Sequence, residues 1–340
     1  MDWYLAAPFI NSTDDLWLTK FVPNLGGAFR FFSVPAAYHH DRSREITNRT
    51  QWGDYFRHGS SVWNKARSAN TPAGIMTCFP QLALTVSLRK RIAFSNIPLI
   101  AWTFNIGTLH GGIRRQIART ALQGVNRFIV HSRAEISTYS EWLDLPPSKF
   151  EFVPLQRSIR KIEIAESEAS PFLLSMGSAH RDYRLLFAVL GELGYPTIVV
   201  AGQHAVAGLT VPPNVAVHFG LSADQCYELV QRARLTVIPV ANRRTASGQV
   251  TLLDAMMFGR PVIITECPAS VDYVIDKQDA LLVRHGDHGD LKRALQTLWE
   301  DSIQRAALGR AARASMINRF SDEAIGKKMG NILTAVSEGL

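Results

Sequence analysis

The residues best suited to chemistry lie in one stretch of the second half, Ala246-Ser-Gly-Gln-Val-Thr-Leu-Leu-Asp-Ala-Met-Met-Phe-Gly-Arg-Pro-Val262. A glycine precedes a helix-forming run, so we expect a helix that begins at Gly248 or Gln249. The first turn of a helix presents unpaired N–H groups and a partial positive charge, which suit a diphosphate. Asp254, further along, is suited to accept hydrogen bonds from the two hydroxyls of a ribose. The alternative is a capped helix in any α/β protein, with Asp254 on its surface.

The elements around this stretch predict one Rossmann-like domain, because short apolar runs alternate with amphipathic segments. We expect strands over 171–176, 196–201, 215–218, 235–239 and 261–265, and helices over 183–193, 223–233 and 250–258. The first half is less regular. There we expect strands over 3–7, 29–33, 97–103 and 127–131, a helix over 134–143, and a basic, aromatic stretch over 42–67.

The length of the chain predicts two domains. A chain of 340 residues fits two ordinary domains, each with its own core and with a cleft between them. Hydrophobic residues make up 46% of it and charged residues 19%, which is typical of an ordered protein. The polar segment 158–170 has no apolar period, so we expect the linker there, between domains over 1–158 and 165–319.

The stretch that begins at Ala246 resembles the C-terminal signature of family 4 of the retaining glycosyltransferases. The usual form of that signature is a Glu, seven residues, Glu-Ala-Met and then Gly-x-Pro-Val. Phe172-Leu-Leu-Ser-Met-Gly177 is similar to the strand and glycine turn that open the family's nucleotide domain, with Arg181 in the place of a phosphate-binding Lys. Further resemblances, over most of the chain, are Phe128-Ile-Val-His-Ser132, Ser148-Lys-Phe-Glu-Phe-Val-Pro154, Val199-Val-Ala-Gly202 and Val217-His-Phe-Gly220.

The resemblance implies the GT-B fold, an α/β architecture of two Rossmann-like domains that face each other across a cleft. The N-terminal domain would bind the acceptor and the C-terminal domain the nucleotide sugar. A C-terminal helix over 320–340 would cross back to the first domain. The resemblance implies no metal and no cofactor, because arginine and helix N–H groups replace the metal. The co-substrate is a nucleotide diphosphate sugar, which we expect to be a UDP-sugar.

Two departures from the family pattern bear on the donor site. Ala246 replaces the first Glu of the signature, so contacts to the sugar fall to Ser247, Gly248 and Gln249. Ser178 replaces an Arg after the glycine turn, so Arg181 would hold the phosphates with Arg184, since Arg suits a bidentate grip. His218 could contact the base. The donor-binding set that the resemblance implies is Gly177, Arg181, Arg184, Gly202, His218, Ser247, Gly248, Gln249 and Asp254.

The resemblance also implies a mechanism without a strong protein base. We expect front-face substitution, in which the leaving diphosphate, stabilised by Arg181 and helix N–H groups, assists deprotonation of the acceptor hydroxyl. Asn105 lies where the family often has a His and would orient a hydroxyl; we class Asn105 and Arg181 as catalytic. A double displacement would need a carboxylate nucleophile. Glu135 and Asp54 are the acidic candidates, and a surface or capping role is favoured for both.

The net charge of +8 is unevenly distributed along the chain. Residues 1–160 carry 19 Lys and Arg against 10 Asp and Glu, and the remainder carries 18 against 19. Such a domain attracts anionic lipid, nucleic acid or an acidic substrate. We therefore hypothesise a peripheral enzyme on the inner face of the membrane with a lipid acceptor such as diacylglycerol. The membrane or acceptor residues would be Trp52, Arg57, Trp63, Arg89, Lys90, Arg91, Arg114 and Arg115.

The basic stretch also contains Arg42 and Arg44. The alternative for the whole set is that the aromatic residues form a core and the charges a solvated face. The lipid hypothesis resembles bacterial diacylglycerol glycosyltransferases that use UDP-glucose, UDP-galactose or UDP-glucuronic acid, hence a hexosyl- or glucuronosyltransferase. A polysaccharide, polyprenyl-linked or lipopolysaccharide acceptor is the alternative.

Other classes of protein fit the sequence less well. A dehydrogenase would need a GxGxxG turn, which is absent. A basic nucleic-acid-binding protein would suit the charge, but no motif for it is present, and we expect no nucleic-acid partner. Ala246 also admits a catalytically inactive homologue.

Compartment and metal content follow from the N-terminus and the cysteines. The start of the chain lacks the features of a signal peptide, and the three cysteines lack CxxC spacing. We therefore expect a cytoplasmic protein without a zinc site. The sequence does not give the oligomeric state.

Overall fold

The computed structural model describes residues 1–10, 17–23, 28–38, 47–241 and 246–339. It divides the chain into two compact units, Met1–Pro154 with Ile325–Leu340, and Leu155–Ala324. Each unit is an α/β domain around a six-stranded sheet, and the strands of the described residues pair in parallel. Two Rossmann-like sheets confirm the expected fold class.

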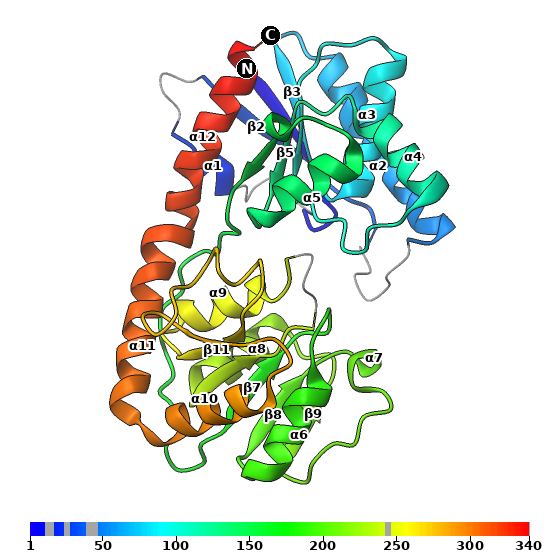
Figure 1. The fold of residues 1–340 in the computed structure, drawn as a ribbon. Helices are drawn as coiled ribbons and strands as arrows, with labels where there is room; N and C mark the ends of the chain where they lie inside the picture. Colours follow the sequence, from blue (N-terminus) through cyan, green and yellow to red (C-terminus); the bar gives the residue numbers. More distant parts are fainter. Residues whose placement is uncertain (11–16, 24–27, 39–46, 242–245, 340) are drawn as a thin grey trace. The chain divides into compact units, whose positions relative to one another are not determined.

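The first unit has the strand order β2-β1-β3-β4-β5-β6 (Figure 1). Its strands are β1 (Asp2–Ala6), β2 (Arg30–Val34), β3 (Ala73–Cys78), β4 (Leu99–Trp102), β5 (Arg127–Val130) and β6 (Phe150–Phe152). Its helices are α1 (Trp17–Phe21), α2 (Arg49–Arg67), α3 (Pro80–Ile92), α4 (Gly112–Leu122), α5 (Ala134–Leu143) and the 3-10 turn η2 (Pro147–Lys149), with most of α12 (Asp322–Glu338).

Two apolar layers sandwich this sheet, because successive strand residues point to opposite faces. On one face α2, α3, α4 and α5 bury residues such as Tyr55, Val86 and Tyr139 against the strands. On the other face α1 and α12 pack over Trp3 and Leu5. The last helix of the chain contributes five residues to this second layer, Ile325, Met329, Ile332, Leu333 and Val336.

The second unit has the strand order β12-β11-β10-β7-β8-β9 (Figure 1). Its strands are β7 (Leu173–Met176), β8 (Thr197–Val200), β9 (Val215–His218), β10 (Leu235–Ile238), β11 (Val262–Thr265) and β12 (Leu281–Val283). Its helices are α6 (Tyr183–Leu193), α7 (Gln203–Val206), α8 (Ala223–Arg232), α9 (Gln249–Met257), α10 (His288–Glu300) and α11 (Ser302–Ser315), which continues into the π-helical η3 (Met316–Phe320).

The expected linker 158–170 lies within the second unit, and its polar residues are in contact with that unit. Gln231 of α8 accepts a hydrogen bond from the backbone of Glu163 at 2.7 Å. The carboxylate of Glu166 pairs with Arg234 at 3.2 Å and with Arg260 at 3.6 Å. Polar contacts of this kind explain why the segment lacks an apolar period, and its role as an interdomain linker stays a prediction.

Candidate functional site

The candidate site lies at the topological switch point of the second sheet, where the order in which the chain adds strands reverses; we call this point the reversal. From β7 the chain proceeds to β8 and β9 on one side, and β10 then lies on the other side of β7. Open α/β sheets bind ligands at the carboxyl ends of the strands that flank such a reversal. The segment after β7 carries Gly177 and Arg181, and the segment after β10 leads to Ser247 and Gly248. The structure thus brings these predicted donor-site residues together.

Arg181 is the central cation of this site. Its guanidinium donates hydrogen bonds to the carbonyls of Met176 and Ala179, both at 3.0 Å, and to the hydroxyl of Ser247 at 3.2 Å. It also donates to the hydroxyl of Thr251 at 3.4 Å, a contact that the sequence interpretation missed. Burial lowers the pKa of Arg181, although an arginine stays protonated at neutral pH. No described carboxylate forms an ion pair with it, so its positive charge is left for an anion.

Gly177 makes room for this guanidinium. Its φ is +109°, a conformation that favours glycine. A Cβ built on it would lie 2.5 Å from Nη2 of Arg181, which is closer than real contacts allow. Tyr183 donates a hydrogen bond at 2.6 Å to the Gly177 carbonyl and fixes the turn. The backbone conformation therefore favours a glycine at this position, and a Cβ there would displace the guanidinium of Arg181.

The helix expected near Gly248 is α9, and its N-cap is Gly248 with φ +91°. The N-terminus of α9 faces the same loop as Arg181, because Ser247 and Thr251 on either side of its first residues both contact the guanidinium. Gln249 is buried in the first turn. Backbone N–H groups and a guanidinium together make an anion site.

Asp254 is buried in α9 and is only 7% exposed, so the alternative of a surface carboxylate is wrong. Burial raises the pKa of Asp254, and the nearby Arg157 opposes that rise. The two side chains form an ion pair at 3.1 Å between Nε and Oδ1. No pattern in the sequence indicated Arg157, which comes from the start of the second unit. A ribose at Asp254 would share this carboxylate with Arg157.

The remaining predicted donor residues lie at different distances from the reversal. Gly202 follows β8, and its N–H donates at 2.6 Å to the hydroxyl of Ser178, next to Gly177. Arg184 is exposed in the first turn of α6, and no contact of the described residues joins it to the site. His218 is exposed at the end of the edge strand β9, two strands away from β7. Only Gly202 of the three is brought to the site.

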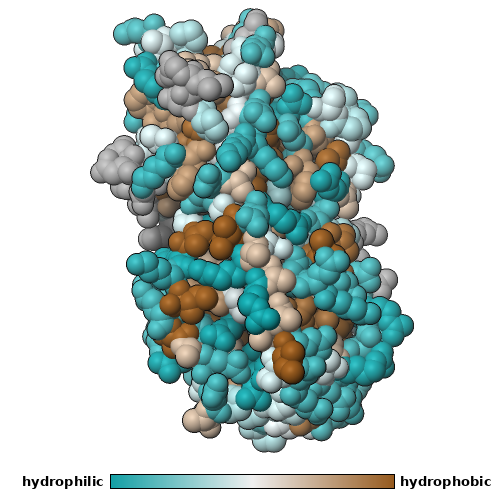
Figure 2. Space-filling model, turned by 90° about the vertical axis from the view of Figure 1, so that its left-hand side faces the viewer, coloured by the Kyte–Doolittle hydropathy of each residue, from teal (hydrophilic) through white to brown (hydrophobic). Residues whose placement is uncertain are grey.

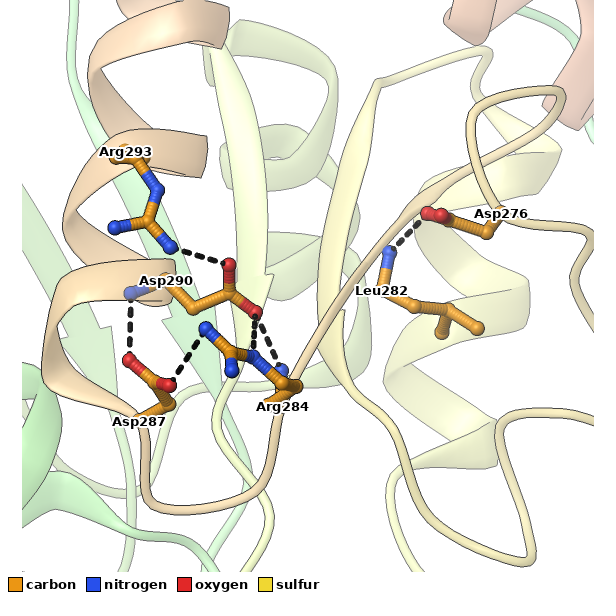
Figure 3. Close-up of polar contacts among 6 residues, drawn as sticks. All are labelled: Asp276, Leu282, Arg284, Asp287, Asp290 and Arg293. Carbon is orange, nitrogen blue, oxygen red and sulfur yellow. Dashed lines mark hydrogen bonds and ion pairs between the residues drawn. The ribbon is translucent and has the colours of Figure 1, made fainter.

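Two described arginines of this unit, Arg284 and Arg293, are neutralised by carboxylates. Arg284, which follows β12, pairs with Asp287 at 2.8 Å and with Asp290 at 3.3 Å (Figure 3). Asp290 also pairs with Arg293 at 3.0 Å. The Arg284 backbone N–H and these side chains lower the pKa of Asp290. This cluster fixes the start of α10, and it contrasts with the unpaired charge of Arg181.

In the first unit Asn105 follows β4, as the resemblance implied. Its side-chain oxygen accepts a hydrogen bond from the Gly107 N–H at 2.8 Å, which shapes the turn. Glu135 is fully buried and accepts from the backbone N–H groups of His131 and Ser132, both at 3.1 Å, so it caps α5. Asp54 pairs with Arg57. Glu135 and Asp54 thus have the capping and surface roles that the sequence favoured.

The aromatic part of the membrane hypothesis is wrong for Trp63. This side chain is 5% exposed and packs in the core between α2 and the sheet. Trp52 is partly buried and packs against the same core, with its ring 6.2 Å from that of Tyr55. The sequence could not separate a helix face that carries core aromatics from an interfacial one.

Most of the predicted basic residues are engaged in local contacts. Lys90 donates to the side chain of Asn126 at 2.6 Å, and Arg115 donates to the Trp142 carbonyl at 2.8 Å. Arg89 contacts Ser60, and Arg91 contacts the Thr120 carbonyl. Arg57 and Arg114 are exposed. Arg42 and Arg44 lie outside the described residues.

The described residues contain no helix long and apolar enough to cross a membrane. On the face drawn in Figure 2, hydrophobic residues occur in separate groups among hydrophilic ones. The described part of the chain also holds no group of three or more His, Cys, Asp or Glu that could bind a metal ion.

The two Rossmann-like units define a protein of the GT-B fold, and solved structures share it. Sucrose-phosphate synthase from Thermosynechococcus elongatus matches with a TM-score of 0.73 and 15% identity, over 100% of this chain and 99% of that one. Anabaena HepE in complex with UDP-glucose matches with a TM-score of 0.66 and 14% identity over 82% of each chain. The lipopolysaccharide outer core galactosyltransferase WaaB matches with 0.65 and 12% over 100% of each.

Residues 179–301, which include most of the candidate site, match the family model of the group 1 glycosyl transferases. This part of the chain is therefore similar to that family, in agreement with the resemblance. The D-rhamnosyltransferase WbpZ of Pseudomonas aeruginosa is 26% identical over 149 residues, which are 42% of this chain and 39% of that protein. The match thus spans about two fifths of the curated relative.

Proposed function

We propose that the protein is a glycosyltransferase that moves a sugar from a UDP-sugar to a saccharide acceptor. The observation that carries the proposal is the guanidinium of Arg181, which no described carboxylate neutralises, beside the N-terminus of α9 at the reversal of the second sheet. A diphosphate is the ligand that this combination suits. The UDP-glucose bound to HepE supports a UDP-sugar as donor.

In this proposal Arg181 and the first N–H groups of α9 stabilise the leaving diphosphate. Ser247, Gly248 and Gln249 contact the sugar, and Asp254 accepts from the ribose. Asn105 orients a hydroxyl in the first unit. The transfer retains the configuration at the anomeric carbon by front-face substitution, since Glu135 and Asp54, the carboxylates considered as nucleophiles, have structural roles among the described residues. Product analysis by NMR checks this step, and an inverted anomeric product would contradict it.

A saccharide acceptor is favoured over diacylglycerol by the comparisons. WaaB is described as a transferase of the lipopolysaccharide outer core, and no protein named among the similar ones is described as acting on diacylglycerol. Trp63 is buried, and Lys90 and Arg115 form hydrogen bonds within the first unit, which weakens the argument for a lipid acceptor.

The test of the proposed function is a donor screen by release of nucleotide from UDP- and GDP-sugars, with UDP binding measured by calorimetry. Turnover of a UDP-sugar and binding of UDP are the expected results. Binding of no nucleotide and turnover of no donor would refute the proposal.

A lipid surface remains a second candidate because of one observation on α4. Ile113 and Ile117 are 78% and 56% exposed, one helical turn apart, and the exposed Arg114 lies beside them. Such a face suits insertion into an anionic bilayer. Sedimentation with vesicles of phosphatidylglycerol and phosphatidylcholine tests it. Wild type that stays in the supernatant, or the double variant Ile113→Ser, Ile117→Ser that sediments equally, would refute it.

A further inference from the structure

The sheet of the first unit has a reversal of its own. From β1 the chain reaches β2 on one side, and β3 then pairs with the other side of β1. A ligand site is therefore expected at the carboxyl ends of β1 and β3. The loops that leave these two ends carry Phe9 and Phe79. Neither residue has a role in the donor site, which lies in the second unit.

Phe9 is presented at the tip of a tight turn. The Ile10 N–H donates to the Ala7 carbonyl at 3.1 Å, and Pro8 between them restricts the backbone. The Phe9 side chain is 53% exposed. Its ring stands edge-on to the ring of Phe79, with the centroids 6.1 Å apart and an interplanar angle of 77°. This contact holds an exposed aromatic ring in one orientation.

The backbone at the same edge is strained, which a purely structural loop would not require. Phe79 has φ +69° and ψ +149°, a combination that is essentially confined to glycine. Its N–H donates to the carbonyl of Trp102 at 3.3 Å, and Pro80 follows it as the first residue of α3. Thr103, directly after the neighbouring strand β4, has φ +51°. Strain of this kind gathers at ligand sites, where it places side chains.

We propose that Phe9, supported by Phe79, is the platform on which a pyranose ring of the acceptor stacks. One face of a pyranose consists of C–H bonds with slight positive charge, which match the negative face of an aromatic ring. The polar side chains of Thr103 and Asn105 follow β4 at the same edge and supply partners for the hydroxyls. A mixed aromatic and polar edge suits a neutral sugar better than an acyl chain. This inference rests on the proposed function and names the chemistry of its acceptor.

Saturation-transfer NMR with methyl α-D-glucopyranoside and methyl β-D-galactopyranoside tests the platform, with UDP binding by calorimetry in parallel. Wild type should bind at least one glycoside, and Phe9→Ala should weaken that binding about five- to tenfold, as expected for the loss of one stacking contact. Phe9→Trp should restore it. The control is Phe94→Ala, because Phe94 is 93% exposed and follows the end of α3 at the opposite edge of the sheet. UDP affinity should be unchanged in all variants.

Glycoside binding that is equal in wild type and Phe9→Ala would overturn the inference, and so would a wild type that binds UDP but neither glycoside. In both cases the proposed function stands. A wild type that does not bind UDP would instead refute the proposed function.

Discussion

Replacement of Arg181 by alanine should selectively weaken recognition of the diphosphate. The guanidinium lies beside Ser247 and Thr251, close to the N-terminus of α9, and none of its partners among the described residues is anionic. The variant removes a cation whose charge no described carboxylate offsets, so the loss should fall on an anionic ligand. Uridine, which lacks the phosphates, should bind wild type and variant alike.

The magnitude follows from charge and burial. Two unit charges 4 Å apart interact with about 4 kcal/mol at an effective dielectric constant of 20. Arg181 is partly buried, and its hydrogen bonds to Met176 and Ala179 hold the group in place before the ligand binds. Desolvation of both partners offsets part of the attraction. A loss of about 2–3 kcal/mol is therefore expected, which is about 30- to 150-fold in the dissociation constant of UDP.

The matched control is Arg184→Ala, which removes the same charge from an exposed position three residues away. It should change UDP affinity by less than about threefold, because exposed charges are screened. Calorimetry with UDP and uridine on the three proteins decides the matter. If Arg181→Ala binds UDP as tightly as wild type, or if Arg184→Ala loses as much, the assignment of the phosphate site is refuted.

Three further perturbations test the surroundings of the site and the fold. Gly177→Ala should weaken UDP binding several-fold, because its Cβ displaces the guanidinium of Arg181. The control is Gly208→Ala, which has φ +73° and no atom within 4 Å of its Cβ and so carries only the backbone cost; equal effects of the two variants in UDP titrations would contradict the expected displacement. Burial raises the pKa of Asp254, so the affinity of the wild type for UDP should fall as the pH drops through that raised value. Asp254→Asn should remove this pH dependence; calorimetry with UDP from pH 4 to 7 checks this. Burial lowers the pKa of His131 to about 4, so between pH 4 and 6.5 the unfolded chain binds more protons than the folded one. The free energy of unfolding should therefore rise by at most about 3 kcal/mol over this range; urea unfolding of His131→Gln should show no such rise.

Strands β7 to β11 and helices α6, α8 and α9 of the second unit could be predicted because strands and helices alternate regularly there, whereas β12, α7, α10 and α11 were not predicted. The expected helix 183–193 and strand 215–218 have the bounds of α6 and β9. The first unit was harder. Helices α2, α3 and α4 and strand β3 were not predicted, since α2 is rich in polar and aromatic residues and α3 buries only part of its surface. Helix α2 gains its stability from packing on the sheet, which no local pattern reveals.

In the candidate site, too, only some of the residues could be predicted from the sequence. Gly248 could be found because a helix start leaves a mark in the sequence, and Gly177 and Arg181 were expected from the family resemblance. The partners of these residues could not be found, because they depend on contacts over long separations. Thr251 meets Arg181 across 70 residues, and Arg157 meets Asp254 across 97. The sequence therefore predicts the ligand-binding loops better than it predicts the long-range hydrogen bonds and ion pairs of their side chains.

The two sheets offer different chemistry at equivalent positions, and this difference is an argument for two kinds of ligand. Each sheet reverses its direction beside its first strand, β1 or β7, and each reversal has loops at the carboxyl ends of two neighbouring strands. A diphosphate needs a fixed cation and N–H groups, which Arg181 and α9 supply. A saccharide has no net charge, so it needs a flat apolar surface and directional hydrogen bonds, for which Phe9 and Asn105 are suited. If both sheets bound anionic ligands, the reversal of the first sheet would also need a cation. The described residues at the carboxyl ends of β1 and β3 have aromatic rings there instead, so variants at the two reversals should separate donor binding from acceptor binding.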